Sequence, residues 1–190
     1  MPTLSASAVP SDHDSSAPAP AAAGAQARLF IGLWPDDAQR WEARAHQQLW
    51  RWPPQARPTP ASKLHLTLHF IGEVPLAQVE PLAQAMPASF TAAELTFSHP
   101  ALWRGGIAVL EPEAVPPSLL SLHAQLGLRL RQLGVALEAR PWRPHLTLAR
   151  QAQGAKTPTN PPPLHWRLAQ LALVQSEGGF YKVLRTAEAV

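Results

Sequence analysis

The tetrapeptide His-Leu-Thr-Leu stands twice in the chain, at residues 65–68 and 145–148, 80 positions apart. Side chains in a β-strand alternate between two faces. Each copy is therefore predicted to present its histidine and threonine on one face and to bury its two leucines on the other. If the two strands face one another, the side chains of His65, Thr67, His145 and Thr147 meet in one cleft.

The segments around the two tetrapeptides predict a domain in which strands and helices alternate. Short apolar runs indicate strands, whereas apolar residues spaced by three and four indicate helices. Strands are expected over residues 28–34, 64–70, 92–98, 107–111, 145–149, 168–174 and 181–187. Helices are expected over residues 35–49, 75–86 and 117–133, and loops over residues 51–62 and 151–163. Each tetrapeptide follows a helix and a charged or proline-rich approach, which predicts an α+β fold of two related lobes.

Residues 1–27 are predicted to form a disordered tail, and residues 28–190 a single domain. The tail is rich in Ala, Pro and Ser, so it cannot bury enough apolar surface to offset its ordering entropy. It lacks the basic start and apolar core of a secretory signal, and no stretch of the chain approaches the ~20 apolar residues of a membrane span. We therefore expect a cytoplasmic monomer that does not enter a membrane.

Composition restricts the available chemistry. The 190 residues include no cysteine, which excludes disulfides, thiolate nucleophiles, zinc–thiolate sites and iron–sulfur clusters. Residues 28–190 carry 16 Lys and Arg against 11 Asp and Glu, and 13 of these 16 bases are arginine, whose planar fork suits phosphate oxygens. A genome-wide bias toward Ala, Arg and Pro would produce the same excess. The charge therefore permits a nucleotide or nucleic-acid partner without requiring one.

Two facing histidines can cleave a phosphodiester without a metal. A neutral imidazole takes a proton from the attacking water or hydroxyl, and an imidazolium gives a proton to the leaving oxygen. Both forms are available near neutral pH because the ordinary pKa of histidine is roughly 6.5. The hydroxyls of Thr67 and Thr147 can donate hydrogen bonds to the phosphate oxygens, where negative charge must be stabilised. The spacing of the residues does not distinguish the roles of the two histidines.

Several segments together resemble the two-histidine (2H) phosphoesterases. They are the paired tetrapeptides, the strand Arg28–Trp34 followed by Pro-Asp-Asp, the segments Leu64–Glu73 and Pro144–Arg150, and the ending from Ser176 to Tyr181. Within that superfamily the chain is most similar to the bacterial and archaeal RNA 2′,3′-cyclic phosphodiesterases, historically called 2′-5′ RNA ligases. The resemblance covers roughly residues 28–190. It implies a bilobal α+β fold with an internal pseudo-duplication, two antiparallel sheets facing a central cleft, and helices outside.

The resemblance also implies an activity and a role for each motif residue. The activity is metal-independent hydrolysis of RNA 2′,3′-cyclic phosphate ends to 2′-phosphates, without a cofactor. His65 would protonate the departing 3′ oxygen, and His145 would accept a proton from water. Thr67 and Thr147 would hold the phosphate. Arg150 matches an arginine that binds phosphate or nucleotide, although strict alternation from His145 places it on the wrong face unless the strand ends or bulges first.

Other side chains near the motifs are weaker candidates for binding the substrate. Arg143 and Lys63 flank the two motifs and could form a basic rim. Trp142 and Phe30 could stack on bases, as aromatic side chains do at single-stranded RNA ends, although core packing is the usual role of tryptophan. His69 lies two residues after Thr67, so we expect it on the cleft side, as a partly exposed strand-end residue or as a ligand of phosphate or sugar.

Three alternatives remain open at this point. The first is related chemistry on the same fold, either 2′-5′ RNA ligation or cleavage of 2′-5′ oligonucleotides. The second is a non-catalytic module that binds RNA ends or nucleotides, although both histidines and both threonines are intact. The third is a metal hydrolase that uses His65, His69 and His145, which the lack of acidic residues near the motifs argues against.

Overall fold

The computed structural model describes residues 25–190, so most of the tail predicted over residues 1–27 lies outside the described residues. The helices are α1 (Asp37–Gln48), α2 (Leu76–Gln84) and α3 (Pro117–Gln132), together with the 3-10 turn η1 (Ala61–Lys63). The strands are β1 (Gln26–Trp34), β2 (Arg57–Pro58), β3 (Leu66–Pro75), β4 (Ser89–Phe90), β5 (Ala93–Trp103), β6 (Ile107–Pro112), β7 (Leu146–Arg150), β8 (Leu164–Leu168), β9 (Gln170–Glu177) and β10 (Phe180–Ala189). Each predicted strand and helix is present, but β2, β4 and β8 were not predicted, and β1 begins two residues earlier than expected.

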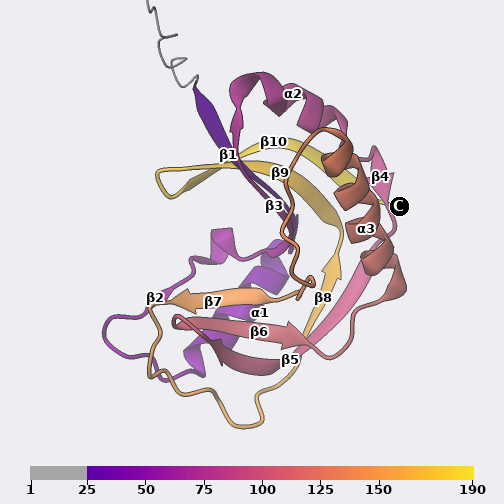
Figure 1. Cartoon of the computed structure of the whole chain (residues 1–190). Coiled ribbons are helices and arrows are strands. Elements are labelled where there is room, and N and C mark those ends of the chain that lie inside the picture. The colour runs from indigo at the N-terminus through magenta and orange to yellow at the C-terminus, as the bar shows by residue number, and fades with distance from the viewer. Residues whose placement is uncertain (1–24) are drawn as a thin grey trace, which may run out of the picture.

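The strands form two halves that meet at one point. Hydrogen bonding orders them β4-β10-β9-β1-β3-β7-β6-β5-β8, and β2 adds to β7. Among the described residues, a single pair, Leu66 with Leu146, joins β3 to β7. Figure 1 shows β1, β3, β9 and β10 on one side of this joint and β5, β6 and β7 on the other. The two antiparallel sheets expected from the sequence are therefore the halves of one ten-stranded sheet, in which only the short contact between β4 and β10 is parallel.

Helices α1 and α3 each pack on the half of the sheet opposite to the strand that precedes them in the chain. Helix α1 follows β1 in the chain but packs against β8 of the second half, whereas α3 follows β6 and packs against β3 of the first. Helix α2 packs on β1 and β3. Local sequence sets the ends of these helices: Asp36 and Gln39 form a capping box before α1, and α3 stops before Gly134, whose φ of 80° favours glycine. No helix among residues 25–190 has the length and apolarity to cross a membrane.

The repeated tetrapeptides occupy the joint between the halves. Leu66, Leu68, Leu146 and Leu148 are each at most 2% exposed, as the strand pattern predicts. Because the paired residues are the same residue of each copy, the two strands are related by an approximate local twofold axis at this point. Directly opposed residues of antiparallel strands project to the same face. The histidines and threonines therefore share the face opposite the leucines.

A β-bulge follows the threonine in each copy. On β3 the partners on β1 are Gly32 for Thr67 and Ile31 for His69, so Leu68 is the extra residue. On β7 the partners on β6 are Val109 for Thr147 and Ala108 for Ala149, so Leu148 is the extra residue. An extra residue shifts the alternation of faces by one position. The bulges therefore exchange the faces of the residues that follow, up to a second bulge at Ile71 on β3.

This shift corrects one expectation and supports another. His69 pairs with buried Ile31 and lies on the core side, only 7% exposed, so its predicted place in the cleft is wrong. Its Nε2 is 2.8 Å from the carbonyl oxygen of His123 on α3. Arg150, which strict alternation would have turned away, returns to the face of Thr147. The bulge that this residue needs is present.

Buried Gln47 on α1 holds the second bulge in place. Its Nε2 donates to the carbonyl oxygen of Leu148 at 2.7 Å and to that of Thr59 at 3.0 Å. The backbone N–H of Thr59 donates to the same Leu148 carbonyl at 2.8 Å. Helix α1 and the end of β2 thus satisfy the backbone groups that the bulge leaves without ladder partners.

We predict that Gln47→Leu destabilises the protein by about 1–3 kcal/mol, because the change removes the amide donor from the Thr59 carbonyl and one of two donors from the buried Leu148 carbonyl. Gln48→Leu is the matched control: Gln48 is the next residue of the same helix but is exposed, so its replacement should shift stability by no more than about 0.5 kcal/mol. Urea unfolding at neutral pH measures both changes. Equal stability of the two variants would show that the buried amide does not support the bulge.

Candidate active site

His65 and His145 present their rings in the same way. The Nδ1 of His65 lies 2.7 Å from the carbonyl oxygen of Lys63, and the Nδ1 of His145 lies 2.7 Å from that of Arg143. A carbonyl oxygen only accepts hydrogen bonds, so Nδ1 carries the proton in each ring. In a neutral imidazole Nε2 then holds a free lone pair, and in an imidazolium Nε2–H is a free donor. Each ring is therefore prepared to act as a base or as an acid through Nε2.

Burial makes both imidazoles reluctant to take a charge. The pKa of His65 is lowered to about 4, chiefly by loss of solvation and also by the neighbouring His145 and Arg150, against the hydrogen bond to Lys63, which raises it. Burial also lowers the pKa of His145, which its hydrogen bond to Arg143 and the Glu111 carboxylate partly restore. His145 lies near enough to act on the pKa of His65, as the Leu66–Leu146 pairing requires. Because both pKa values lie below the ordinary value of histidine, the neutral form of each ring predominates at pH 7.

Aromatic side chains surround His65. The Trp34 ring stacks on it with centroids 4.9 Å apart and planes at 12°, and the Phe30 ring lies at 4.9 Å. Tyr181 meets it edge-on at 5.7 Å. A Cβ at Gly32 would lie 3.0 Å from Trp34 and 3.2 Å from His65, so the absence of a side chain there permits this packing. The predicted cleft position of Phe30 agrees with the structure, because its ring contacts His65.

His145 has different neighbours. The centroids of the Trp103 and His145 rings are 4.3 Å apart. The Arg143 guanidinium lies over the Trp103 ring, 4.6 Å from its centroid. Arg143 also forms a bidentate ion pair with Glu111 at 2.5 and 2.9 Å. In the free protein Glu111 thus pairs with the charge of Arg143, and the substrate contact of Arg143 stays a prediction.

Thr67, Thr147 and Arg150 complete the face that carries the histidines. Both threonines are half-buried and face the same side as His65 and His145. Arg150 is exposed and lies close enough to lower the pKa of both histidines and to oppose the raised pKa of Tyr181. Two imidazoles, two hydroxyls and one guanidinium thus share one face: strand alternation predicted the first four, and the family resemblance implied Arg150.

Trp142 and Lys63 have structural contacts in the free protein. The Trp142 N–H donates to the carbonyl oxygen of Thr67 at 3.0 Å, and its ring stacks on His123 at 4.3 Å. His123 stacks in turn on His69 at 4.1 Å, on the core side of β3. The Lys63 ammonium donates to the carbonyl of Gly179 in the β9–β10 turn. Trp142 therefore has a structural role in the free protein, and its stacking on a base stays a prediction. Lys63 ties the β9–β10 turn to the segment that carries His65.

Sequence reasoning missed three aromatic residues of the site, namely Trp34, Trp103 and Tyr181. A signal for the first was present, because Phe30, Gly32 and Trp34 stand two residues apart on β1 and so share one face. Trp103 and Tyr181 reach the histidines from the ends of β5 and β10, which belong to the β5–β6 and β9–β10 hairpins and lie far in sequence from the histidines that they contact.

The three-histidine metal site does not form. The bulge at Leu68 places His69 on the opposite face from His65 and His145, so the three rings do not converge. Within the part of the chain that the structure describes, no cluster of three or more His, Cys, Asp or Glu side chains is arranged to hold a metal ion.

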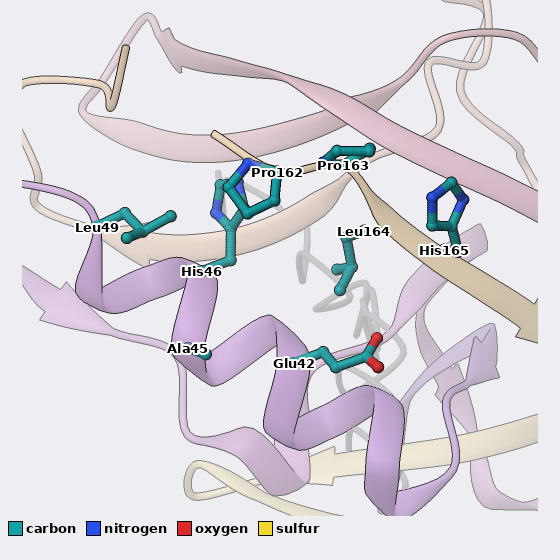
Figure 2. A pocket seen from close by; sticks show the side chains of 8 residues that line it. All are labelled: Glu42, Ala45, His46, Leu49, Pro162, Pro163, Leu164 and His165. Atoms are coloured by element: carbon teal, nitrogen blue, oxygen red, sulfur yellow. The ribbon is translucent and has the colours of Figure 1, made fainter. Parts of the chain in front are cut away.

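A pocket of about 430 Å³ lies away from the histidine pair, between α1 and β8 (Figure 2). Its lining shares no residue with the site described above and consists of Glu42, Ala45, His46, Leu49, Pro162, Pro163, Leu164 and His165. His46 is 4% exposed, neither ring nitrogen has a partner among the described residues, and burial lowers its pKa. The histidine pair lies instead on an open face of the joint.

Comparison with known proteins agrees with this geometry. The family model of the 2′-5′ RNA ligase superfamily matches residues 32–180. The RNA 2′,3′-cyclic phosphodiesterase of Escherichia coli (strain K12) is 33% identical over 148 residues, which cover 75% of this chain and 81% of that protein. The protein of the same name from Geobacillus stearothermophilus is 32% identical over 100 residues, 47% of this chain and 31% of that protein.

The solved structure of E. coli LigT complexed with 3′-AMP superposes with a TM-score of 0.75 at 26% identity, and the match covers 87% of this chain and 99% of that chain. Residues 32–180, which the family model matches, include both tetrapeptides and the bulges that follow them. The chain therefore belongs to the 2′-5′ RNA ligase superfamily.

Proposed function

We propose that this protein hydrolyses RNA 2′,3′-cyclic phosphate ends to 2′-phosphates, as an RNA 2′,3′-cyclic phosphodiesterase. One observation carries the proposal: pairing of Leu66 with Leu146 sets two imidazoles on one face, each with Nε2 free and Nδ1 fixed by a backbone carbonyl. Arg150 adds a positive charge beside both. The relationship to the E. coli RNA 2′,3′-cyclic phosphodiesterase supports the same reaction.

The reaction we propose needs one acid and one base. Nε2 of neutral His145 takes a proton from a water molecule as its oxygen bonds to phosphorus. The bond from phosphorus to the 3′ oxygen breaks, and Nε2–H of the His65 imidazolium protonates that oxygen. The products are a 2′-phosphomonoester and a free 3′ hydroxyl. Thr67, Thr147 and Arg150 donate hydrogen bonds to the non-bridging oxygens, on which charge accumulates.

The surroundings of the two histidines support this division of roles. The aromatic neighbours of His65 give it the lower pKa, so its imidazolium is the stronger acid toward a poor leaving group such as an alkoxide. The Glu111 carboxylate beside His145 favours uptake of a proton there. A bound phosphate raises the pKa of both rings by the same electrostatic attraction, which makes a protonated His65 accessible near neutral pH.

The related activities use the same residues. Ligation that forms a 2′-5′ linkage reverses the proton transfers, and cleavage of a 2′-5′ oligonucleotide replaces the cyclic ester by a linear one. A non-catalytic binding module would keep the phosphate contacts but would not need two free Nε2 atoms. We place hydrolysis first because the two relatives named above are both RNA 2′,3′-cyclic phosphodiesterases. A cytoplasmic location and a monomeric state remain predictions.

We predict that His65→Ala and His145→Ala each lower the turnover of an oligonucleotide ending in a 2′,3′-cyclic phosphate by about 10²- to 10⁴-fold. His99→Ala, which removes an exposed histidine of β5, is the control and should keep full activity. Chromatographic identification of the products with EDTA present tests reaction, regiochemistry and metal independence together. A 3′-phosphate product, loss of activity with EDTA, or tight binding of the 2′-phosphate without turnover would each contradict the proposal.

The lowered pKa values of His65 and His145 predict an unusual pH dependence. The bell-shaped profile of kcat/KM reports the free enzyme, so its centre should lie below pH 6.5. The profile of kcat reports the enzyme–substrate complex, in which the phosphate raises both pKa values, so its centre should lie at higher pH. Steady-state rates from pH 4 to 9 measure both. A kcat/KM profile centred at or above that of kcat would mean that burial does not control these rings.

The division of roles between His65 and His145 makes a separate prediction. A nucleoside 2′-(4-nitrophenyl) phosphate has a leaving group that needs no proton. His65→Ala should therefore lose much less activity on this substrate than on a cyclic phosphate, whereas His145→Ala should lose a similar factor on both. Parallel rate measurements decide between the two assignments. Rescue of the His145 variant instead would reverse the roles.

A further inference from the structure

A cross-strand pair of arginines lies at the edge of the site. Strand β3 pairs with β7 only at Leu66 and Leu146, and β2 pairs with the following residues of β7. In this register Arg57 lies directly opposite Arg150. Directly opposed residues of an antiparallel pair project to the same face. Because the bulge at Leu148 turns Arg150 to the face of the histidines, Arg57 lies on that face too. Both side chains are exposed.

The Arg57–Arg150 pair carries two positive charges without a partner in the described part of the chain. The ion pairs found there join Arg40 to Asp37, Arg140 to Glu138 and Arg143 to Glu111. Neither Arg57 nor Arg150 donates a side-chain hydrogen bond to any residue in the range 25–190. Like charges directly opposite one another destabilise a sheet. The arrangement therefore costs stability in the free protein, and an anion placed between or beside the two guanidiniums would remove that cost.

Arg150 and Arg57 differ in their distance from the histidines. Arg150 lowers the pKa of His65 and His145 and acts on Tyr181, so it lies beside the reacting group. Arg57 influences none of these three side chains. The pair therefore extends away from the reacting phosphate by one cross-strand step, with Arg150 inside and Arg57 outside.

We propose that Arg57 binds a second phosphate of the substrate, the phosphodiester that links the terminal nucleotide to the rest of the RNA strand. Arg150 holds the reacting cyclic phosphate, and its cross-strand neighbour holds the next anion along the chain. This inference rests on the proposed function and adds a substrate class to it: a strand that bears a phosphate 5′ to the reacting nucleoside, in preference to a nucleoside 2′,3′-cyclic phosphate alone.

Three substrates that share the same reacting end test this inference. They are adenosine 2′,3′-cyclic phosphate, the same compound with a 5′-phosphate, and a short oligonucleotide that ends in it. Arg57→Ala should lower kcat/KM by about tenfold on the two substrates with a second phosphate, and leave the first within about twofold. Arg150→Ala should impair all three. Arg167→Ala is the control, because Arg167 is exposed on β8, three strands from β7.

Two further measurements separate a binding role from a structural one. The slope of log kcat/KM against log salt concentration for the oligonucleotide should become shallower by about 0.7 in Arg57→Ala, which is the value for one phosphate contact on a single strand. The melting temperature of free Arg57→Ala should equal or exceed that of the wild-type protein, because a repulsive pair is lost. Arg57→Lys should retain part of the preference for longer substrates.

The outcomes distinguish the inference from the proposed function. If the wild-type protein turns over none of the three substrates, the proposed function and the inference about Arg57 are both overturned. If the wild-type protein is active and Arg57→Ala affects all three substrates equally, or none of them, the inference alone is overturned. A lower melting temperature of the variant together with a uniform loss of activity would show that Arg57 supports the fold.

Discussion

The pairing of Leu66 with Leu146 is the contact on which the site depends. It joins the two halves of the sheet at one place and sets equivalent residues of the two tetrapeptides opposite one another. Since both leucines are completely buried, the residues beside them must project to the other face. One hydrophobic contact therefore fixes the relative placement of both imidazoles. A slip of one residue in this register would bury a histidine and expose a leucine, which the burial of both leucines opposes.

The two strands share the bulge after the threonine but carry different side chains beyond it. In both strands the bulge places the next residue in the core and the one after it on the cleft face. On β3 those residues are His69 and Phe70, whereas on β7 they are Ala149 and Arg150. The same backbone thus presents on one strand the Phe70 ring, 6.4 Å from that of Phe30, and on the other the Arg150 guanidinium, which acts on both histidines. The two halves have kept one geometry while their side chains serve different purposes.

Much of this site could be predicted from the sequence, and the errors have physical causes. The tetrapeptides predicted which side chains share a face, because alternation is a local rule of the strand. Alternation failed at His69, since a bulge depends on the partner strand β1 and leaves no mark in the tetrapeptide itself. The same uncertainty left the face of Arg150 open. The strand β8 was missed because its alternating residues follow three prolines, although its apolar positions are all buried.

Trp142 shows a different limit of sequence reasoning. Its position just before the second tetrapeptide suggested a contact with substrate, but proximity in the chain is a poor guide to the direction of a large side chain. The indole donates to the Thr67 carbonyl of the first tetrapeptide and stacks on His123 of α3. It thereby ties the approach to one motif to the backbone of the other and to a helix.

The contrast between His65 and His145 follows from the same asymmetry. Each ring is oriented by a carbonyl two residues earlier, so the backbone makes both histidines equally able to act through Nε2. The surrounding side chains then separate them: rings from β1 and β10 desolvate His65, whereas Glu111 from β6 offers His145 a negative charge. A chemical step with one acid and one base needs two groups of unequal basicity. The repeated tetrapeptide supplies the two imidazoles, and the difference between their neighbouring side chains makes them unequal in basicity.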